Sequence, residues 1–150
     1  MTPDVATQLA AWRKHDIPAA WVRIVDVRGF GGADTTGSMA VAGDQDRPPI
    51  GRLLGGVVDD DVRTLVVPIL DASRSALVVG LSVTDQPATD AGMVCGGRVE
   101  LLAQRLDSVP VALWDALRAG RPATVVTVCS GPAAGATAVV DDTGAFGRTG

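Results

Sequence analysis

The stretch "GMVCGGRVELLAQRL" (92–106) decides the fold. A cysteine, Cys95, stands directly before Gly96 and Gly97, and the chain then continues as an alternating apolar run over 98–106. Glycine permits tight turns and close approach of other groups to the backbone, because it has no Cβ. The pattern therefore predicts a strand over 98–106 that begins at a turn made for another segment or for a ligand.

Working outward, alternating and buried apolar patterns predict the other strands, and capping signals with 3.6-residue periodicity predict the helices. Strands are expected at 19–27, 38–42, 75–83, 123–129 and 136–142, and helices at about Pro3–His15, Val57–Leu70 and Val109–Ala119. Simple alternation in the first strand would put Trp21, Arg23, Val25 and Val27 on one side and Val22, Ile24 and Asp26 on the other. The fold class expected from this order is α+β, with a mixed sheet and about three helices.

The sequence contains an internal repeat of helix, strand, loop and strand. Residues 9–29 match 113–131, since both run from a helix through a proline into a β-rich strand, and 37–56 match 135–150. The second copy, from about residue 108, stops at Gly150 within the motif, which predicts a fragment or a short relative. Chance similarity in an Ala/Val/Gly-rich chain is the alternative. We expect one domain over 1–150.

Charge and hydropathy exclude several functions. The net charge is −4 and the basic residues do not cluster, so a nucleic-acid surface is not expected. The apolar runs are too short to span a bilayer, and the N-terminus has no apolar signal segment. These features predict a cytoplasmic protein that does not bind membranes, with Cys95 and Cys129 reduced.

Familiar catalytic patterns are missing. His15 is the only histidine and falls at the end of the first helix, so a Ser-His-Asp triad or a zinc site is not expected. The loop "RGFGGADTTG" (28–37) runs into a strand and lacks dinucleotide-binding spacing. Three aspartates, 59–61, follow Gly55 and Gly56; they satisfy the dipole of the predicted helix and would repel phosphate.

Three segments together resemble the XdhC/CoxI family, the accessory proteins of molybdenum hydroxylases such as xanthine dehydrogenase and carbon monoxide dehydrogenase. They are "IPAAWVRIVDVRG…MAV" (17–41), "GRLLGGVVDDDV" (51–62) and "VTDQPATDAGMVCGGRVELLAQRL" (83–106), and the likeness covers about residues 8–131. The resemblance implies a protein that binds the molybdenum cofactor (molybdopterin), assists its sulfuration and delivers it to the hydroxylase apoenzyme. Such a chain is an accessory protein more than an enzyme.

The resemblance also implies site residues. Cys95 would hold molybdenum or sulfur, since a soft thiolate suits both, and it is the metal-contacting residue of this prediction. The backbone cradle would consist of Gly55, Gly56, Gly96 and Gly97, with Asp59 as an outer polar contact. The alternative for Cys95 is a small buried side chain at a turn.

The chain departs from the family pattern at two of the three segments. Val57 stands where the family usually has cysteine, and Asp59 where it has glutamate. The family's Ser-x-Pro-Arg loop is replaced by "FGGAD", with Phe30, Gly32, Ala33 and Asp34. The Rossmann domain of many members is absent from this chain, and a partner chain that carries it is one alternative left open by the sequence. A homodimer is one alternative for the assembly of the chain. For its function, the alternatives are a docking or assembly module without cofactor and a small enzyme recruited from this fold.

Overall fold

The computed structural model describes residues 1–32, 34–44 and 46–148; Ala33 and Gly150, which the sequence comparison used, lie outside them. The elements in chain order are α1 (Pro3–Lys14), β1 (Ala19–Gly29), β2 (Ser38–Ala42), β3 (Ile50–Arg52), the 3-10 turn η1 (Leu54–Gly56), α2 (Asp59–Leu65), α3 (Val67–Leu70), β4 (Ala76–Val83), α4 (Asp85–Asp90), β5 (Gly97–Arg105), the 3-10 turn η2 (Leu106–Ser108), α5 (Val111–Arg118), β6 (Ala123–Thr127), β7 (Thr137–Asp141) and β8 (Gly144–Arg148).

The strand that follows Cys-Gly-Gly joins the two halves of the main sheet. This sheet has the order β3-β2-β1-β5-β4, and every neighbouring pair is antiparallel. Along β5, Gly97 pairs with both Gly29 of β1 and Val83 of β4, while the far end pairs Arg105 with Ala20. The predicted strand over 98–106 is thereby confirmed at a central position in the sheet.

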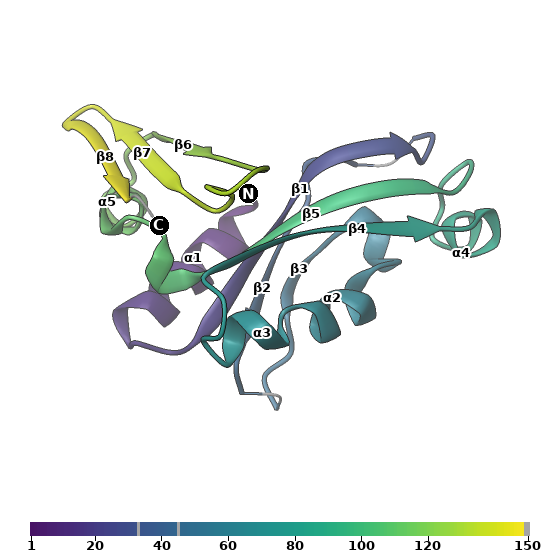
Figure 1. The fold of residues 1–150 in the computed structure, drawn as a ribbon, viewed down its shortest axis with the longest axis horizontal. Coiled ribbons are helices and arrows are strands. Elements are labelled where there is room, and N and C mark those ends of the chain that lie inside the picture. Colours follow the sequence, from purple (N-terminus) through teal and green to yellow (C-terminus); the bar gives the residue numbers. More distant parts are fainter. Residues whose placement is uncertain (33, 45, 149–150) are drawn as a thin grey trace.

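The five-stranded sheet separates two apolar cores (Figure 1). One face of the sheet packs with α2 and α3, which lie below it in Figure 1, and with α4, which lies beyond the end of β4. The other face packs with α1 and α5, and these two helices also contact each other. A bulge in β1, where Ile24 pairs with Leu101 and Asp26 with Glu100, changes the alternation expected for this strand. Val27 therefore joins Val22 and Ile24 on the α2–α3 face, so its predicted side was wrong.

A second sheet has the order β6-β7-β8 and is also antiparallel. The α+β class is confirmed, but the strands form two antiparallel sheets and not one mixed sheet. The described residues contain five α-helices because Pro68 divides the predicted helix over 57–70 into α2 and α3, and because the predicted loop over 84–97 contains α4.

The two sheets contain matching units. We call α1-β1-β2-β3 the first unit and α5-β6-β7-β8 the second unit; each runs from a helix through a proline into an antiparallel meander. Five residue pairs join the first two strands in both, from Ala19↔Ala42 to Arg23↔Ser38 and from Ala123↔Asp141 to Thr127↔Thr137. The two units thus share their element order and the register of their first two strands.

A buried polar cluster joins the two units. Gln104, on β5, is completely buried and donates to the Gly135 carbonyl at 2.9 Å and to the Thr137 hydroxyl at 2.7 Å. Its Oε1 accepts a hydrogen bond from Arg23, whose guanidinium also stacks 3.9 Å from the Trp21 ring centroid. Burial lowers the pKa of Arg23 to about 10, partly offset by the Coulombic effect of Cys129, so the guanidinium remains charged at neutral pH.

Candidate functional site

The residues of the three quoted segments meet at the end of the main sheet where β5 begins. Gly97 is the first residue of β5 and pairs with Gly29, the last residue of β1. Beyond this pair, the Phe30 N–H donates to the Gly96 carbonyl at 3.1 Å, and the Val94 N–H donates to the Gly31 carbonyl at 3.0 Å. Two backbone hydrogen bonds therefore hold the loop after β1 against the loop that carries Cys95.

Gly96 is held against the end of β4. A Cβ at this position would lie 2.3 Å from the Val83 carbonyl oxygen and 2.7 Å from the Thr84 carbonyl carbon, so only glycine fits. Its N–H donates to the Asp85 carboxylate at 2.8 Å, in the first turn of α4. The backbone donor that the sequence assigned to a cofactor is thus satisfied by the chain's own carboxylate.

Phe30 occupies the space beside Gly97. A Cβ at Gly97 would lie 2.7 Å from Cδ2 of the Phe30 ring, and the phenylalanine itself is 2% exposed. Its φ of +53° is rare for a bulky residue and carries backbone strain. The glycine-rich loop after β1 therefore packs a buried aromatic ring against the start of β5.

The Gly55-Gly56 turn is adjacent to the same loop. Leu54, Gly55 and Gly56 have consecutive positive φ values of +49°, +67° and +99°. A Cβ at Gly55 would lie 3.1 Å from the Ala91 carbonyl oxygen, which places η1 beside the segment that follows α4. Leu54 is 2% exposed and, like Phe30, is an apolar residue in a strained conformation. The three segments, 29–32, 54–56 and 91–97, thus form one cluster, which we call the loop cluster.

Asp59 closes the η1 turn. Its Oδ1 accepts the Leu53 N–H at 3.3 Å, and its Oδ2 lies 3.4 Å from where a Cβ of Gly56 would be. Burial is the main cause that raises the pKa of Asp59; the Leu53 hydrogen bond and the charge of Arg52 act against it. The carboxylate is half-buried and binds the η1 turn next to the loop cluster, unlike the carboxylate of a fully solvated helix start.

The glycines do not form an open anion cradle. The side-chain space of Gly96 is filled by the backbone of 83–85, that of Gly97 by the Arg28 carbonyl and the Phe30 ring, and that of Gly55 by the Ala91 carbonyl. With Asp85 and Asp59 the cluster carries two carboxylates, which repel an anionic pterin phosphate. The Cys95 thiol is free and half-buried, and as a soft donor it is the one group here that suits molybdenum or sulfur.

The sequence interpretation missed Asp85 and Phe30 as parts of this cluster. Asp85 follows Thr84 and precedes Pro87, a helix-start pattern within the segment predicted as a loop. Phe30 stands alone among glycines, and a large apolar residue in such a loop is a signal for burial.

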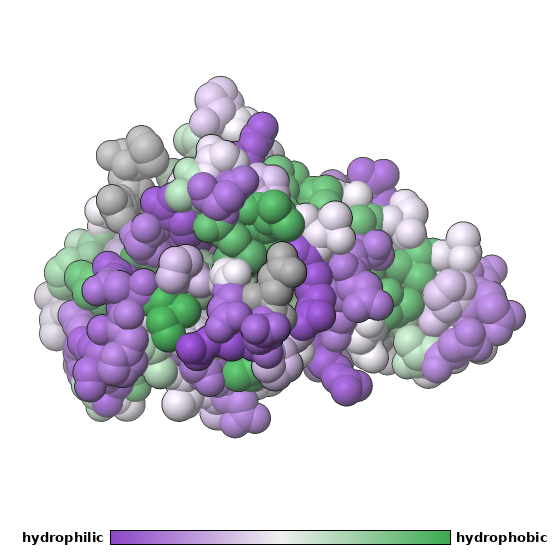
Figure 2. Space-filling view, turned by 90° about the horizontal axis from the view of Figure 1, so that it is seen from below, coloured by the Kyte–Doolittle hydropathy of each residue, from purple (hydrophilic) through white to green (hydrophobic). Residues whose placement is uncertain are grey.

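Two cavities lie away from the loop cluster. One of about 570 Å³, between the β2–β3 loop and α2–α3, is bordered by Arg47, Arg63, Val67 and Leu70 among others. Figure 2 shows the side of the molecule that carries α2 and α3, where hydrophobic residues form separate patches among hydrophilic ones. None of the predicted site residues lines this cavity.

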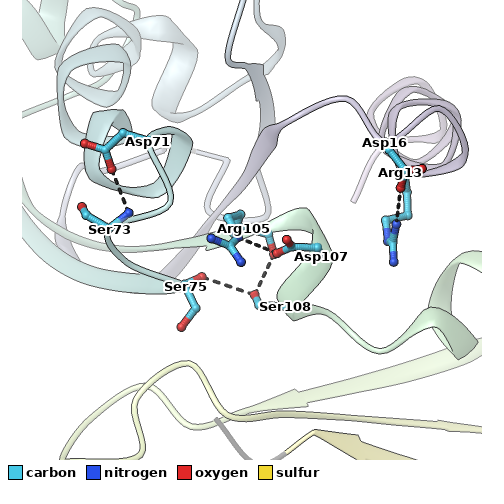
Figure 3. A network of polar contacts seen from close by, with 8 residues as sticks. All are labelled: Arg13, Asp16, Asp71, Ser73, Ser75, Arg105, Asp107 and Ser108. Carbon is cyan, nitrogen blue, oxygen red and sulfur yellow. Dashed lines mark hydrogen bonds and ion pairs between the residues drawn. The ribbon is translucent and has the colours of Figure 1, made fainter.

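A second cavity, of about 380 Å³, lies between the end of α1 and the end of β5. Figure 3 shows the two ion pairs that border it. Arg13 of α1 pairs with Asp16 at 3.0 Å, and Arg105 of β5 pairs with Asp107. Since each guanidinium in this cavity is neutralised by its own aspartate, the cavity has no net charge from these pairs to attract an anion.

Within the described ranges, no three His, Cys, Asp or Glu side chains are grouped as a metal site would require. The same ranges contain no helix with the length and hydropathy needed to cross a membrane.

Comparisons with known proteins give a fold likeness. No protein family matches the chain, and no curated protein is similar to it in sequence. A crystal structure described as a xanthine dehydrogenase from Bacillus halodurans matches with a TM-score of 0.66 and 18% sequence identity. The match covers 99% of this chain and 45% of the other chain, so the present chain spans less than half of that structure's length.

Proposed function

We propose that the chain is a cytoplasmic accessory protein of a molybdenum hydroxylase, of the XdhC/CoxI kind, and that it acts on the apoenzyme. The observation that carries this proposal is the loop cluster. Three segments distant in sequence, chosen for their family likeness, meet beside Cys95. Strained backbone at Phe30 and Leu54 accompanies them, and such strain concentrates at functional sites. The fold likeness to a chain described as a xanthine dehydrogenase agrees with this proposal.

Cys95 is the residue that we assign to the cofactor. When bound, the molybdenum cofactor would supply a metal centre able to carry a transferable sulfur, and the chain would supply the thiolate that contacts it. Gly55, Gly96 and Gly97 support this role by letting the three loops approach closely, since each faces protein atoms. The proposal therefore places the contact at one side chain and not at a backbone cradle.

The test compares the two cysteines. The chain is purified without oxygen after incubation with molybdenum cofactor, and bound molybdenum and pterin fluorescence are measured for wild type, Cys95→Ser and Cys129→Ser. We expect wild type and Cys129→Ser to retain the cofactor and Cys95→Ser to lose most of it. Equal retention by Cys95→Ser would remove this thiol from the site.

The second candidate is a docking or assembly module that binds no cofactor. It is favoured by the carboxylates of Asp85 and Asp59, which satisfy backbone N–H groups in the loop cluster. In the same experiment, absence of molybdenum and pterin from all three proteins, together with capture of the hydroxylase apoenzyme, would support this module.

A further inference from the structure

We infer that the cavity between the β2–β3 loop and α2–α3 is a binding site for a small carboxylic acid with an apolar body. The cavity has a volume of about 570 Å³. Sites for small molecules have volumes of about 300–1,000 Å³ and combine apolar walls with a few polar groups. No residue of the loop cluster lines this cavity, so the inference does not depend on Cys95 or on a cofactor.

The helical wall of the cavity is a second face of α2 and α3. The first face packs in the core through four buried residues: Val58, Val62, Val66 and Ile69. On the second face, Arg63, Val67 and Leu70 follow one another at intervals of four and three residues, which is the spacing of neighbours on one side of a helix. All three line the cavity, so one wall presents a cation followed by two apolar side chains.

The cavity exposes apolar surface to water. Val67 is 50% exposed, whereas its neighbour Val66 is 1% exposed. Leu70 is half-buried, and Val41 and Ala42 line the cavity from the end of β2. A ligand that covers these side chains removes apolar surface from water, and this removal favours binding.

Four charged side chains border the cavity, and three of them are engaged within the chain. The Nε of Arg47 donates to the Asp44 carboxylate at 3.1 Å, and the Asp71 carboxylate accepts the Ser73 N–H at 2.9 Å. In the described ranges, no hydrogen bond or ion pair joins the exposed guanidinium of Arg63 to another residue. Arg63 is therefore the charged group of this cavity whose donors are free for a ligand.

The free guanidinium selects the head group of the ligand. Its paired N–H donors match the two oxygens of a carboxylate. The four charges of the cavity sum to zero, so a bare anion is not attracted from a distance and Arg63 acts only at contact. The ligand therefore needs both a carboxylate on Arg63 and an apolar body over Val67 and Leu70. At a rise of about 1.5 Å per residue, this body spans about 10 Å.

The test titrates octanoate into the full chain with labelled valine and leucine methyl groups. We expect saturable shifts at Val41, Val67 and Leu70 and none at Val126 or Val140, which are exposed on the second sheet. Acetate has the head group alone and 1-octanol has the apolar chain alone, so each should bind at least about tenfold more weakly than octanoate. Equal affinity of octanoate for Val126 and Val140 would overturn the inference, because it would show general adhesion to apolar surface.

Two variants assign the two parts of the ligand to their residues. Arg63→Gln should weaken octanoate binding about tenfold and leave 1-octanol binding unchanged, whereas Arg118→Gln, at an exposed arginine on α5, should change neither. Val67→Ser should weaken the binding of octanoate and 1-octanol alike. Both side chains are exposed, so these variants should fold as the wild type does. Undiminished octanoate binding by Arg63→Gln, or no saturable shift at Val67 and Leu70 in the wild type, would overturn the inference.

Discussion

The two units of this chain have the same element order and the same strand register, but among the described residues only the first unit is enclosed on both faces. In the first unit, the segment from η1 to β5 returns to cover one face with α2 and α3 and to extend the sheet beyond β1. In the second unit, the described chain ends with β8 at the top of the molecule in Figure 1, and the face of its sheet that points away from α5 remains exposed.

This difference shows that the strands alone do not determine burial. Val22 and Val126 occupy equivalent positions in the matching register and are chemically identical, yet one is 1% and the other 57% exposed. The meander is specified locally by the proline, the alternation and the turns, whereas the core depends on the segment that follows. Each prediction below perturbs one unit and uses the other, or an exposed position, as its reference.

The largest effect is expected at the equivalent valines. Val22→Asp places a charge without a partner in the core and should cost about 4 kcal/mol or more, while Val126→Asp should change stability by less than about 0.5 kcal/mol. Urea denaturation measures both. If Val22→Asp does not fold, Val22→Ala should still cost about 2 kcal/mol against almost nothing for Val126→Ala. Equal losses of unfolding free energy at Val22 and Val126 would show that the two valines are equally buried, against the difference between the two units.

Next in size is the substitution Gly96→Ala, at the point where the covering segment joins the main sheet. The added methyl group would lie 2.3 Å from the Val83 carbonyl oxygen, so β4 and the loop must separate. We expect a loss of about 1–3 kcal/mol in unfolding free energy. Gly147→Ala, on β8, is the reference because a Cβ there meets nothing within 4 Å. A Gly96→Ala protein as stable as Gly147→Ala would show that the loop cluster is not tightly packed.

A somewhat smaller effect should follow when the connection between the units is cut. Gln104→Ala removes the buried amide acceptor of Arg23 and one of the two side-chain donors to the Gly135 carbonyl, which should cost about 2 kcal/mol. Hydrogen exchange should rise mainly in β7, because Thr137 also loses a bond to this side chain. The matched variant Gln86→Ala removes an exposed amide on α4 and should leave exchange in β7 unaltered.

The sequence predicts individual strands and helices better than it predicts which segments pack on each face of a sheet. Periodicity was sufficient for β1, β2, β4, β5, β6, β7 and α1, since each has its own apolar pattern. It did not reveal the bulge after Ile24, because a bulge changes the side of Val27 without changing the letters. Nor did it find β3, which is three residues long and pairs only with β2.

For the candidate site, the sequence indicated the segments but not their contacts. Cys95, the four glycines and Asp59 were singled out by resemblance, and their role toward a cofactor stays a prediction. That Asp85 would satisfy Gly96 depends on α4 folding back onto the end of β4, a contact between residues eleven positions apart. Long-range approach of this kind has no periodic signature, so a backbone donor assigned to a ligand can be satisfied by the chain itself.

The smallest effect should come from Asp59, in the covering segment. Because burial raises the pKa of this carboxyl above 3.8, the folded state holds its proton more tightly than the unfolded state. The contribution of Asp59 to stability therefore falls as the pH rises from 3.8 through the folded-state pKa, and it is unfavourable at pH 7. Asp59→Asn should raise the melting temperature slightly at neutral pH, since the amide oxygen can still accept the Leu53 N–H.

The pH dependence separates this effect from a general gain in helix stability. The difference between Asp59→Asn and wild type should disappear near pH 3, where the carboxyl is protonated in both states. Asp60→Asn is the matched variant, since Asp60 is the exposed neighbour in the same turn of α2 and should give no gain at neutral pH. A gain in melting temperature from Asp59→Asn that persists at pH 3 would contradict this prediction. It would show that burial of the Asp59 carboxylate does not destabilise the folded first unit.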